Sequence, residues 1–275
     1  MSITATATSR DKLDDLRRLT TDLGIGAGLA PARAAAFASH LLWFDAAGIG
    51  RFGLASLGEW LDRIARGEID PRAEGTFGVE HAGTAAMDGR GGLAPLVLAR
   101  AAGVAVEKAR DVGIGLVRVA NLGAAGPAAP IVAEAAVGPT VALAIGPEGS
   151  WAMALPSAEG LPAVFDSAID GTRPEWVDAV APWASALVPE RGWLILALAV
   201  AALEPLGTFH ERVAAGAAIP GPTPGRLRPD EWETRRREAR ERGVALDPAV
   251  RADLIDRAGR LGLSFPKAQG GPAAT

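Results

Sequence analysis

Residues 46–60 read AAGIGRFGLASLGEW, and the glycines of this stretch give the first indication of the fold. Gly48, Gly50 and Gly53 predict a tight turn just before an amphipathic helix, and such a turn lets a small ligand approach the backbone closely. The stretch contains no His, Cys or Lys, and its only charged or nucleophilic side chains are those of Arg51, Ser56 and Glu59. The sequence therefore predicts either a ligand site without the usual proton-transfer residues or a turn with a structural role alone.

Hydrophobic periodicity and turn residues on both sides of this stretch predict an α/β protein. Helices are expected over residues 9–23, 31–46, 54–66, 93–111, 128–137, 230–242 and 248–262. Strands are expected at the start of 84–93, over 113–119 and 140–146, and within 161–171. The apolar run GWLILALAVAAL, residues 192–203, is too short to span a bilayer and is expected to form a buried helix. This order predicts an α/β fold with a helical N-terminal lobe.

The composition narrows the class of protein and of partner. The 275 residues are 49% hydrophobic and 22% charged, which is ordinary for a globular protein. A net charge of −4, without a stripe of Lys and Arg among aromatic residues, argues against nucleic acid as a partner. The absence of cysteine excludes disulfides, thiolate metal sites and a Cys nucleophile. No basic region is followed by an apolar run near the start, so a cytoplasmic protein without a membrane anchor is expected.

Metal binding is not predicted, and two further glycine runs are ambiguous. The three histidines show no metal-ligand spacing, and no carboxylates cluster with them in the sequence. The runs DGRGGL (88–93) and NLGAAG (121–126) each place backbone N–H groups just before a helix, a geometry that favours an anion. Neither run is a GxGxxG that opens a βαβ unit, so a Rossmann domain is not expected. Tight packing explains these runs equally well.

Five blocks, taken in order, resemble the type-2 malate/L-lactate dehydrogenase family. They are DAAGIGRFGLASLGEWLDRIARGEIDP (45–71), TAAMDGRGGL (84–93), GIGLVRVANLGAAG (113–126), LPSAEGLPAVFDSA (155–168) and WETRRREARERGVALD (232–247). That family also includes ureidoglycolate and sulfolactate dehydrogenases, diketogulonate reductase and a cyclic-imine reductase. The resemblance implies a non-Rossmann α/β fold, dependence on NAD or NADP, and a homodimer whose active sites lie near the subunit interface.

The resemblance fails where the family carries its chemistry. The family segment reads approximately D-x-R-G-x-x-S-H-G-x-x-R-L-x-x-Y, with the His as proton donor and the second Arg as a clamp for the substrate carboxylate. In this chain the Ser-His pair falls on Arg51 and Phe52, the clamp falls on Ser56 and the Tyr on Trp60. A phenyl ring cannot donate a proton, and general acid catalysis typically contributes ~10²- to 10⁴-fold. The standard donor is therefore missing.

The later blocks depart from the family as well. The strand that resembles N-S-x-H-F-G-x-A-G-Y reads VANLGAAGP, and Leu122 stands near the missing His. The D-M-A-T-S block survives only as DSA, residues 166–168, and the family's Lys-Gly appears as Arg191 and Gly192. Between the blocks the chain is shorter than the family by a few dozen residues. The expected domains are therefore 1–146 for the helical lobe and substrate pocket, 147–229 for a shortened remnant of the nicotinamide-binding region, and 230–275 for the C-terminal helices, with a Pro/Gly linker over 216–229.

These observations support one leading hypothesis. The chain is expected to be a divergent member that acts on a small anionic oxo acid, imine or related metabolite without standard hydride transfer and without a cofactor. Arg51 would anchor the anionic group, Asp166 and Ser56 would be the catalytic residues, and the rest of the substrate site would be formed by Phe52, Trp60 and Asn121.

Two alternatives remain open. One is an NAD(P)H-dependent reductase, in which either Asp166 is the relocated proton donor or an imine substrate arrives already protonated, and in which Gly126, Ser167 and Arg191 would bind the cofactor. The other is a non-catalytic binding protein. A homodimer is expected in each case, partly because the apolar run 192–203 leaves surface to bury.

Overall fold

A computed structural model describes residues 10–122, 125–158, 160–170, 188, 192–217, 226–227 and 229–266. The chain forms two compact units. Unit 1 combines the residues up to 65 with those from 234 onward, and unit 2 comprises residues 66–233. Each unit is described separately below.

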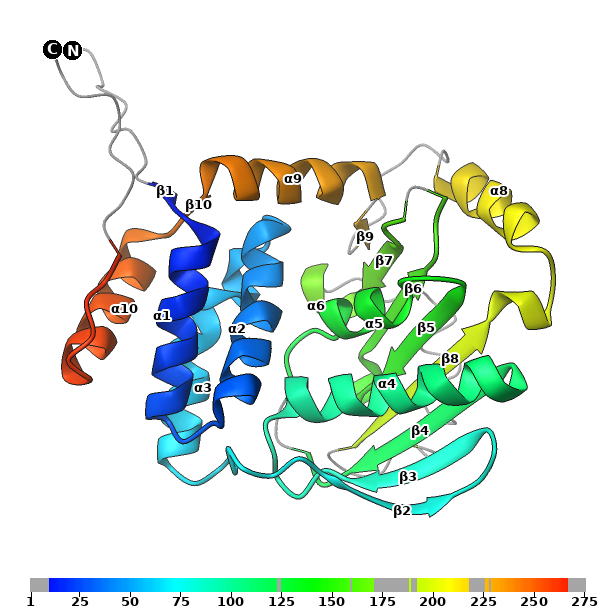
Figure 1. Cartoon of the computed structure of the whole chain (residues 1–275), viewed down its shortest axis with the longest axis horizontal. Coiled ribbons are helices and arrows are strands. Elements are labelled where there is room, and N and C mark those ends of the chain that lie inside the picture. The colour runs from blue at the N-terminus through cyan, green and yellow to red at the C-terminus, as the bar shows by residue number, and fades with distance from the viewer. Residues whose placement is uncertain are drawn as a thin grey trace, which may run out of the picture. The chain divides into compact units, whose positions relative to one another are not determined.

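Unit 1 is mainly helical. Its elements are β1 (Arg10–Asp11), α1 (Leu13–Gly26), α2 (Pro31–Ala46), the 3-10 turns η1 (Gly50–Phe52) and η2 (Leu54–Ser56), α3 (Leu57–Ala65), most of α9 (Pro229–Arg242), β10 (Val244–Ala245) and α10 (Pro248–Arg260). The helices α1 and α2 lie side by side, and α10 lies next to α1 (Figure 1). Pro31 occupies the first turn of α2, where its missing N–H has no intrahelical partner to lose. The expected helical N-terminal lobe is therefore confirmed.

Residues from the two ends of the sequence join in unit 1. The strand β1 pairs antiparallel with β10, and Asp11, which is only 1% exposed, receives two hydrogen bonds of 2.7 and 2.9 Å from the guanidinium of Arg251 on α10. Burial raises the pKa of Asp11, and the Arg251 charge opposes that shift. A buried carboxylate of this kind requires its partner, because an unpaired buried charge typically costs about 3–5 kcal/mol.

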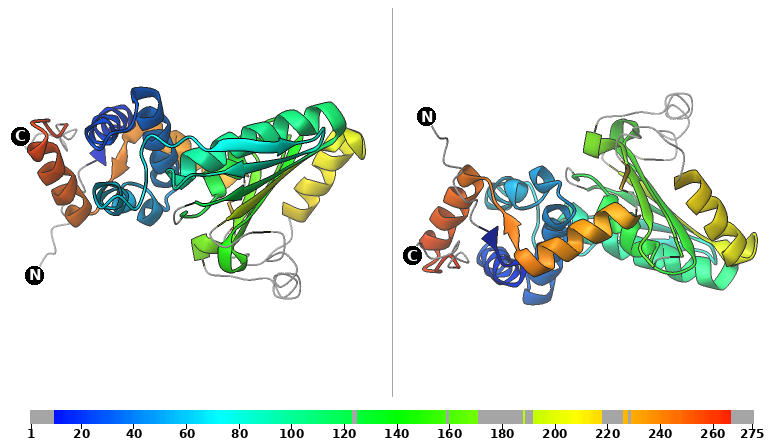
Figure 2. Two further views of the ribbon diagram at one scale, coloured as in Figure 1. Left: turned by 90° about the horizontal axis from the view of Figure 1, so that it is seen from below. Right: turned by 90° about the horizontal axis from the view of Figure 1, so that it is seen from above.

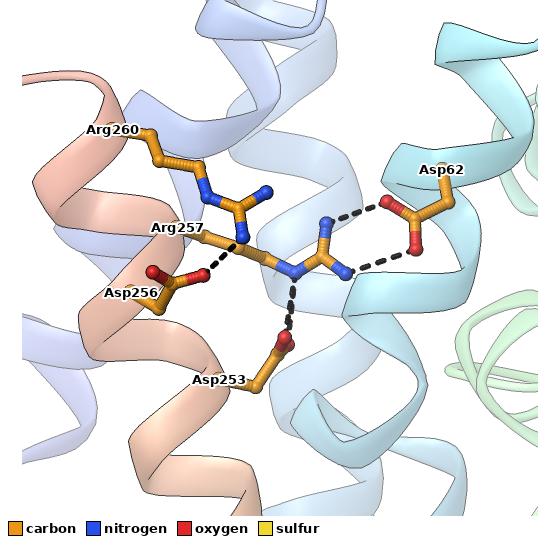
Figure 3. A network of polar contacts seen from close by, with 5 residues as sticks. All are labelled: Asp62, Asp253, Asp256, Arg257 and Arg260. Atoms are coloured by element: carbon orange, nitrogen blue, oxygen red, sulfur yellow. Dashed lines mark hydrogen bonds and ion pairs between the residues drawn. The ribbon is translucent and has the colours of Figure 1, made fainter.

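A second polar network joins α10 to α3 (Figure 3). Arg257 donates two hydrogen bonds to Asp62 on α3, of 2.7 and 3.0 Å, and its Nε lies 2.9 Å from an oxygen of Asp253 one turn earlier on α10. The Arg257 fork is thus shared between two carboxylates, which raises the pKa of Arg257 above its ordinary value. The nearby pair of Arg260 and Asp256 is more exposed. The sequence-distant helix α10 therefore fixes the helix that follows the glycine stretch.

Unit 2 is built on one eight-stranded sheet in the order β2-β3-β4-β8-β5-β6-β7-β9. The strands are β2 (Thr76–Glu80), β3 (Thr84–Asp88), β4 (Ile114–Ala120), β5 (Thr140–Ile145), β6 (Trp151–Leu155), β7 (Ala163–Asp166), β8 (Trp193–Ala199) and β9 (Arg226–Leu227). Among these described strands, β3 and β4 pair in parallel and every other neighbouring pair is antiparallel. This topology confirms the α/β, non-Rossmann prediction.

Helices cover the sheet of unit 2. They are α4 (Ala94–Val112), α5 (Ala129–Ala135), α6 (Ser167–Asp170) and α8 (Leu206–Ala217), with 3-10 turns η3 (Pro147–Gly149) and η4 (Val200–Ala202). The long helix α4 connects the parallel pair and packs on β4 and β8, whereas α5 packs on β5, β6 and β7 (Figure 1). Figure 2 shows α4 running along one face of the sheet. The helix α4 thus forms a βαβ unit with β3 and β4.

The prediction of a buried helix over 192–203 was wrong. Residues 193–199 form β8, a central strand that pairs antiparallel with β4 on one side and β5 on the other. A continuous apolar run does not distinguish a buried strand from a buried helix by periodicity. The strand part of the run is buried within the sheet, and of its large apolar side chains Leu203, beyond the strand, is 69% exposed. The strands β2 and β6 and the helix α8 were not anticipated.

The units differ from the domains expected along the chain. The expected boundary at residue 146 lies between β5 and β6, which pair antiparallel in one sheet and therefore belong to the same unit. The C-terminal helices do not stand alone either, since α10 is bound to β1 through Asp11 and to α3 through Asp62. Most of the expected linker 216–229 lies outside the described residues. No helix within the described ranges is long and apolar enough to cross a membrane.

Candidate functional site

The glycine stretch of unit 1 closes over the side chain of Asp45. This residue lies at the end of α2, and its Oδ2 accepts a hydrogen bond of 2.9 Å from the Leu54 N–H. A Cβ atom at Gly53 would lie 2.2 Å from Oδ2, and one at Gly50 would lie 3.0 Å from Oδ1. These two glycines are therefore needed because a carboxyl group of the same chain fills the turn. The close approach predicted for a ligand is made by Asp45.

Burial sets the protonation of the two titratable groups on this part of α2. Burial raises the pKa of Asp45 from 3.8 to about 7, and the Leu54 N–H opposes the shift only partly. Burial lowers the pKa of His40 from 6.5 to about 4, and its ring packs edge-on against Phe44 at 5.5 Å between centroids. Asp45 therefore exchanges its proton near neutral pH, whereas His40 stays neutral there.

Arg51 and Phe52 lie together on η1, between the two glycines. Arg51 is exposed, and its guanidinium carbon lies 4.7 Å from the centroid of the Phe52 ring. The Phe52 ring is half-buried and packs against Phe44 at 5.8 Å. No carboxylate in the described part of the chain pairs with Arg51, so its charge is available to an anion.

Ser56 and Trp60 have structural contacts. The Ser56 hydroxyl is 2.8 Å from the Gly53 carbonyl and 3.1 Å from the Phe52 carbonyl, so its proton is directed at the backbone. Trp60 is 7% exposed and packs edge-on against Phe37 in the core of unit 1, at 6.1 Å between ring centroids. Neither of these contacts involves a side chain that could act as an acid, a base or a nucleophile.

In unit 2 the structure brings the two other glycine runs together. They follow the parallel strands β3 and β4, whose carboxyl ends are adjacent. The Gly89 N–H donates to the Ala120 carbonyl at 2.7 Å, and the Gly91 N–H donates to the Asn121 carbonyl at 2.8 Å. Ligands of open α/β sheets bind outside the carboxyl ends of parallel strands. The adjacent turns therefore form a second candidate region, which neither run indicated alone.

Asn121 anchors this second region. Its side-chain amide donates to Asp88 at 3.1 Å, and the Arg90 N–H donates to the same carboxylate oxygen at 2.9 Å. These bonds lower the pKa of Asp88, with the Arg90 N–H as the largest cause. Arg90 and Asn121 both have left-handed backbones, with φ of 54° and 53°. Non-glycine residues with left-handed backbones occur often at functional sites, and the role of Asn121 in substrate binding stays a prediction.

Asp166 caps two helices. It is 2% exposed, its Oδ2 accepts a hydrogen bond of 2.7 Å from the Ala129 N–H at the start of α5, and its Oδ1 accepts one of 2.9 Å from the Ala168 N–H in α6. The anion expected before helix 128–137 is thus supplied by the protein itself. Both carboxyl oxygens of Asp166 are therefore engaged by backbone N–H groups, which gives the residue a structural role as a helix cap.

The residues expected to bind a nicotinamide cofactor differ in what they offer an anionic dinucleotide. The Ser167 hydroxyl accepts from the Trp151 N–H at 3.0 Å and donates to the Trp151 carbonyl at 3.1 Å, so its single proton is already engaged. Gly126 faces open space and carries no side-chain donor. Arg191 lies outside the described residues. In the ranges that the structure describes, no group of His, Asp and Glu side chains is placed to hold a metal ion.

Sequence reasoning missed Asp45. The available signal was its position, since a lone carboxylate at the end of an apolar helix directly precedes the glycine run. Its enclosure by residues 50–54 depends on tertiary packing. That packing is not visible in the spacing of residues.

Comparisons with known proteins agree with the fold. The sequence profile of the malate/L-lactate dehydrogenase family matches residues 12–159. Malate dehydrogenase from Pyrococcus horikoshii OT3 has a similar structure, with a TM-score of 0.79 at 17% identity, over 95% of this chain and 98% of that chain. Malate dehydrogenase from Entamoeba histolytica gives a TM-score of 0.78 at 16% identity, over 94% of this chain and 100% of that chain.

A reductase is also similar in structure. The delta1-piperideine-2-carboxylate reductase from Pseudomonas syringae pvar. tomato gives a TM-score of 0.77 at 16% identity, over 91% of this chain and 100% of that chain. No curated protein sequence matches the chain. At these identities the structural similarities show a shared fold.

Proposed function

Because the chain belongs to the malate/L-lactate dehydrogenase family, we propose that it is a divergent enzyme that binds a small anionic oxo acid, imine or related metabolite and does not carry out the standard hydride transfer. One observation carries the proposal. Phe52 occupies the position at which the family resemblance expects the proton donor, and the exposed guanidinium of Arg51 lies over its ring. The turn thus has a cation for an anionic group but lacks the usual acid.

The charge of the segment supports an anionic ligand. Ser56 replaces the expected clamp, so Arg51 is the cation of the turn itself. Arginine binds carboxylates through two parallel hydrogen bonds, and hydrogen bonds to charged groups contribute roughly 1.5–3 kcal/mol. An aromatic ring beneath the guanidinium restricts its motion, which lowers the entropy lost on binding.

Substitution of Arg51 tests this proposal. With pyruvate as the simplest 2-oxo acid, we expect Arg51→Ala to weaken binding about tenfold or more in calorimetry, while the thermal midpoint of unfolding changes little. Arg51→Lys should restore little of the loss, because an ammonium does not reproduce the two-pronged contact. Arg110→Ala removes another exposed arginine, on α4, and serves as the matched control. Equal binding of pyruvate by wild type and Arg51→Ala would overturn the proposal.

We also propose that nicotinamide cofactors bind weakly or not at all. Support comes from Ser167, whose hydroxyl proton is bonded to Trp151. Calorimetric titration with NADH and NADPH should show no binding at micromolar concentrations. Micromolar affinity for either one would contradict the absence of hydride transfer.

A reductase with a relocated proton donor is the second candidate. Burial raises the pKa of Asp45 to about 7, which is suited to proton exchange at neutral pH. Asp45 fits this role better than Asp166, which was expected from the sequence, because Asp166 is fixed by two backbone N–H groups. The cofactor titration separates the two candidates.

A homodimer remains our proposal for the assembly. Four large apolar side chains are 45–69% exposed at one end of the sheet of unit 2, namely those of Val112, Ile114, Val137 and Leu203. Backbone hydrogen bonds from Ala199 to Gly113 and from Val200 to Pro139 hold their segments together. Exposed apolar patches of this kind commonly mark interfaces. Light scattering should report a dimer at micromolar concentration, and a monomer would refute the proposal.

A further inference from the structure

The turn that carries Arg51 packs over a carboxyl group. Residues 50–54 pass over Asp45, the Leu54 N–H donates to Oδ2, and the space at Gly50 and Gly53 is occupied by the two carboxyl oxygens. Arg51 and Phe52 are the residues held between these two glycines. Any change in the Asp45 carboxyl group is therefore transmitted to the backbone on either side of Arg51.

No ion pair stabilises the charge of Asp45 in the described part of the chain. Only the Leu54 N–H opposes the effect of burial on this carboxyl group. On α2 itself, His40 is neutral near pH 7. On η1 the Arg51 guanidinium lies on the Phe52 ring, and η2 carries no charged residue.

Charged groups on the other elements of unit 1 are engaged elsewhere. Arg235 on α9 donates to the Ala47 carbonyl at 3.1 Å. On α3, Glu59 is exposed, Arg63 lies over the Trp60 ring at 5.5 Å, and Asp62 is bound to Arg257. The charged residues in the first half of α1 pair with one another at the surface, and Asp22 is exposed. The carboxyl group thus has one bonded oxygen and no countercharge.

Its second oxygen has a different environment. The Oδ1 atom of Asp45 has no hydrogen-bond partner among the described residues, and it is not fully buried. Water therefore reaches it, and a proton can be exchanged there without unfolding the turn. The Asp45 carboxyl group can therefore gain or lose a proton while the turn stays folded.

From this arrangement we propose that Asp45 is a positioning residue for Arg51, and that its protonation state sets the conformation of the Gly50–Leu54 turn. The ionised carboxylate holds the Leu54 N–H by a charge-assisted hydrogen bond, which is shorter and stronger than a neutral one. The protonated group accepts more weakly and gains an O–H donor. The inference gives the ligand site of the proposed function a dependence on pH, and it rests on that function only for the ligand that Arg51 binds.

The experiment uses the full-length protein without ligand. Aspartate labelled with ¹³C at Cγ reports the ionisation of Asp45 directly, and the amide signals of Gly53 and Leu54 report the turn. We expect the Asp45 Cγ signal and both amide signals to titrate together with a midpoint near pH 7. In Asp45→Asn, which keeps the shape and an acceptor oxygen but does not ionise, the amide titration should vanish. In His40→Gln it should persist.

Three outcomes would overturn the inference. They are a Cγ midpoint near the ordinary value of Asp, amide signals that do not follow the Cγ signal, and an amide titration that persists in Asp45→Asn. The Cγ and amide measurements on wild type decide the matter even if a variant fails to fold. Loss of pyruvate binding in Arg51→Ala tests the proposed function separately, so the two can fail independently.

Discussion

The glycine segment of unit 1 and the paired glycine runs of unit 2 look alike in sequence but are packed differently. In unit 1, Gly50 and Gly53 make room for the carboxyl group of Asp45. In unit 2, the runs are joined through backbone hydrogen bonds from Gly89 and Gly91, and Gly91 faces open space. Glycine in the first region is required by a side chain of the same chain. In the second, Gly89 and Gly92 are tightly packed against Leu122 and the Ala73 carbonyl, and Gly91 alone of the three leaves its backbone exposed.

This difference shows how little a glycine run alone says about ligands. A glycine that touches a neighbouring carboxylate has a structural explanation, whereas one with nothing within 4 Å has space in front of it. Replacement of glycine by alanine should therefore be costly in the first case and tolerated in the second. Three changes test that contrast, and they are ordered here from the largest expected effect to the smallest.

Gly53→Ala should have the largest effect. Its Cβ would lie 2.2 Å from Oδ2 of Asp45, so the carboxyl group or the turn must move. We expect a loss of roughly 2–3 kcal/mol in the free energy of unfolding, measured by denaturant titration. Gly126→Ala, at a position with nothing within 4 Å, is the control and should change stability by less than about 0.5 kcal/mol. The double variant Gly53→Ala/Asp45→Ala should recover part of the loss, and strict additivity would contradict the assigned clash.

Asp45→Asn should change the pH dependence of stability. The native state keeps a proton on Asp45 up to about pH 7, whereas the unfolded chain releases it near 3.8, so wild-type stability falls as pH rises between these values. His40 acts in the opposite direction between 6.5 and about 4, because its unfolded form binds the proton that the native form excludes. Of these two groups, Asp45 alone contributes between 6.5 and about 7.

The expected magnitude follows from the shift. A change from 3.8 to about 7 sets an upper limit of about 4 kcal/mol, and access of water to Oδ1 reduces it to the order of 2 kcal/mol. At about pH 8, Asp45→Asn should be more stable than wild type by that amount in denaturant titrations. Near pH 5 the advantage should shrink. If the difference in unfolding free energy between the two proteins stays constant across this pH range, folding does not raise the pKa of Asp45.

Arg90→Gly should have the smallest effect. Arg90 has a φ of 54°, a conformation that costs non-glycine residues about 1 kcal/mol or more, and glycine relieves it at some entropic cost. We expect a gain of roughly 0.5 kcal/mol in thermal unfolding experiments. Asn121→Gly should gain less, because it also removes the bond to Asp88. A loss of stability at Arg90 would mean that its side chain stabilises the paired runs.

The sequence predicted elements better than it predicted contacts. Helix 31–46 was correct because Pro31 and the apolar spacing are local signals. The run 192–203 was misassigned because its partners β4 and β5 lie far away in the chain, and only pairing with them makes it a strand. Asp166 was expected to act in catalysis, but its partner Ala129 is 37 residues away and no local pattern indicates the double cap. The residues that enclose Asp45 are close in the sequence, with Leu54 nine residues away, but the conformation of the turn between them cannot be read from their spacing.

The pairing of β1 with β10 has a consequence for biosynthesis. Asp11 and Arg251 are separated by 240 residues, so during translation the N-terminal helices emerge long before the arginine that neutralises the buried carboxylate. Unit 2, from residue 66 to 233, is contiguous and can complete its sheet on the ribosome first. Unit 1 must wait for residues 244–260 to leave the exit tunnel. While those residues are still in the tunnel, α1 and α2 are therefore exposed to chaperones and the sheet of unit 2 can already be formed.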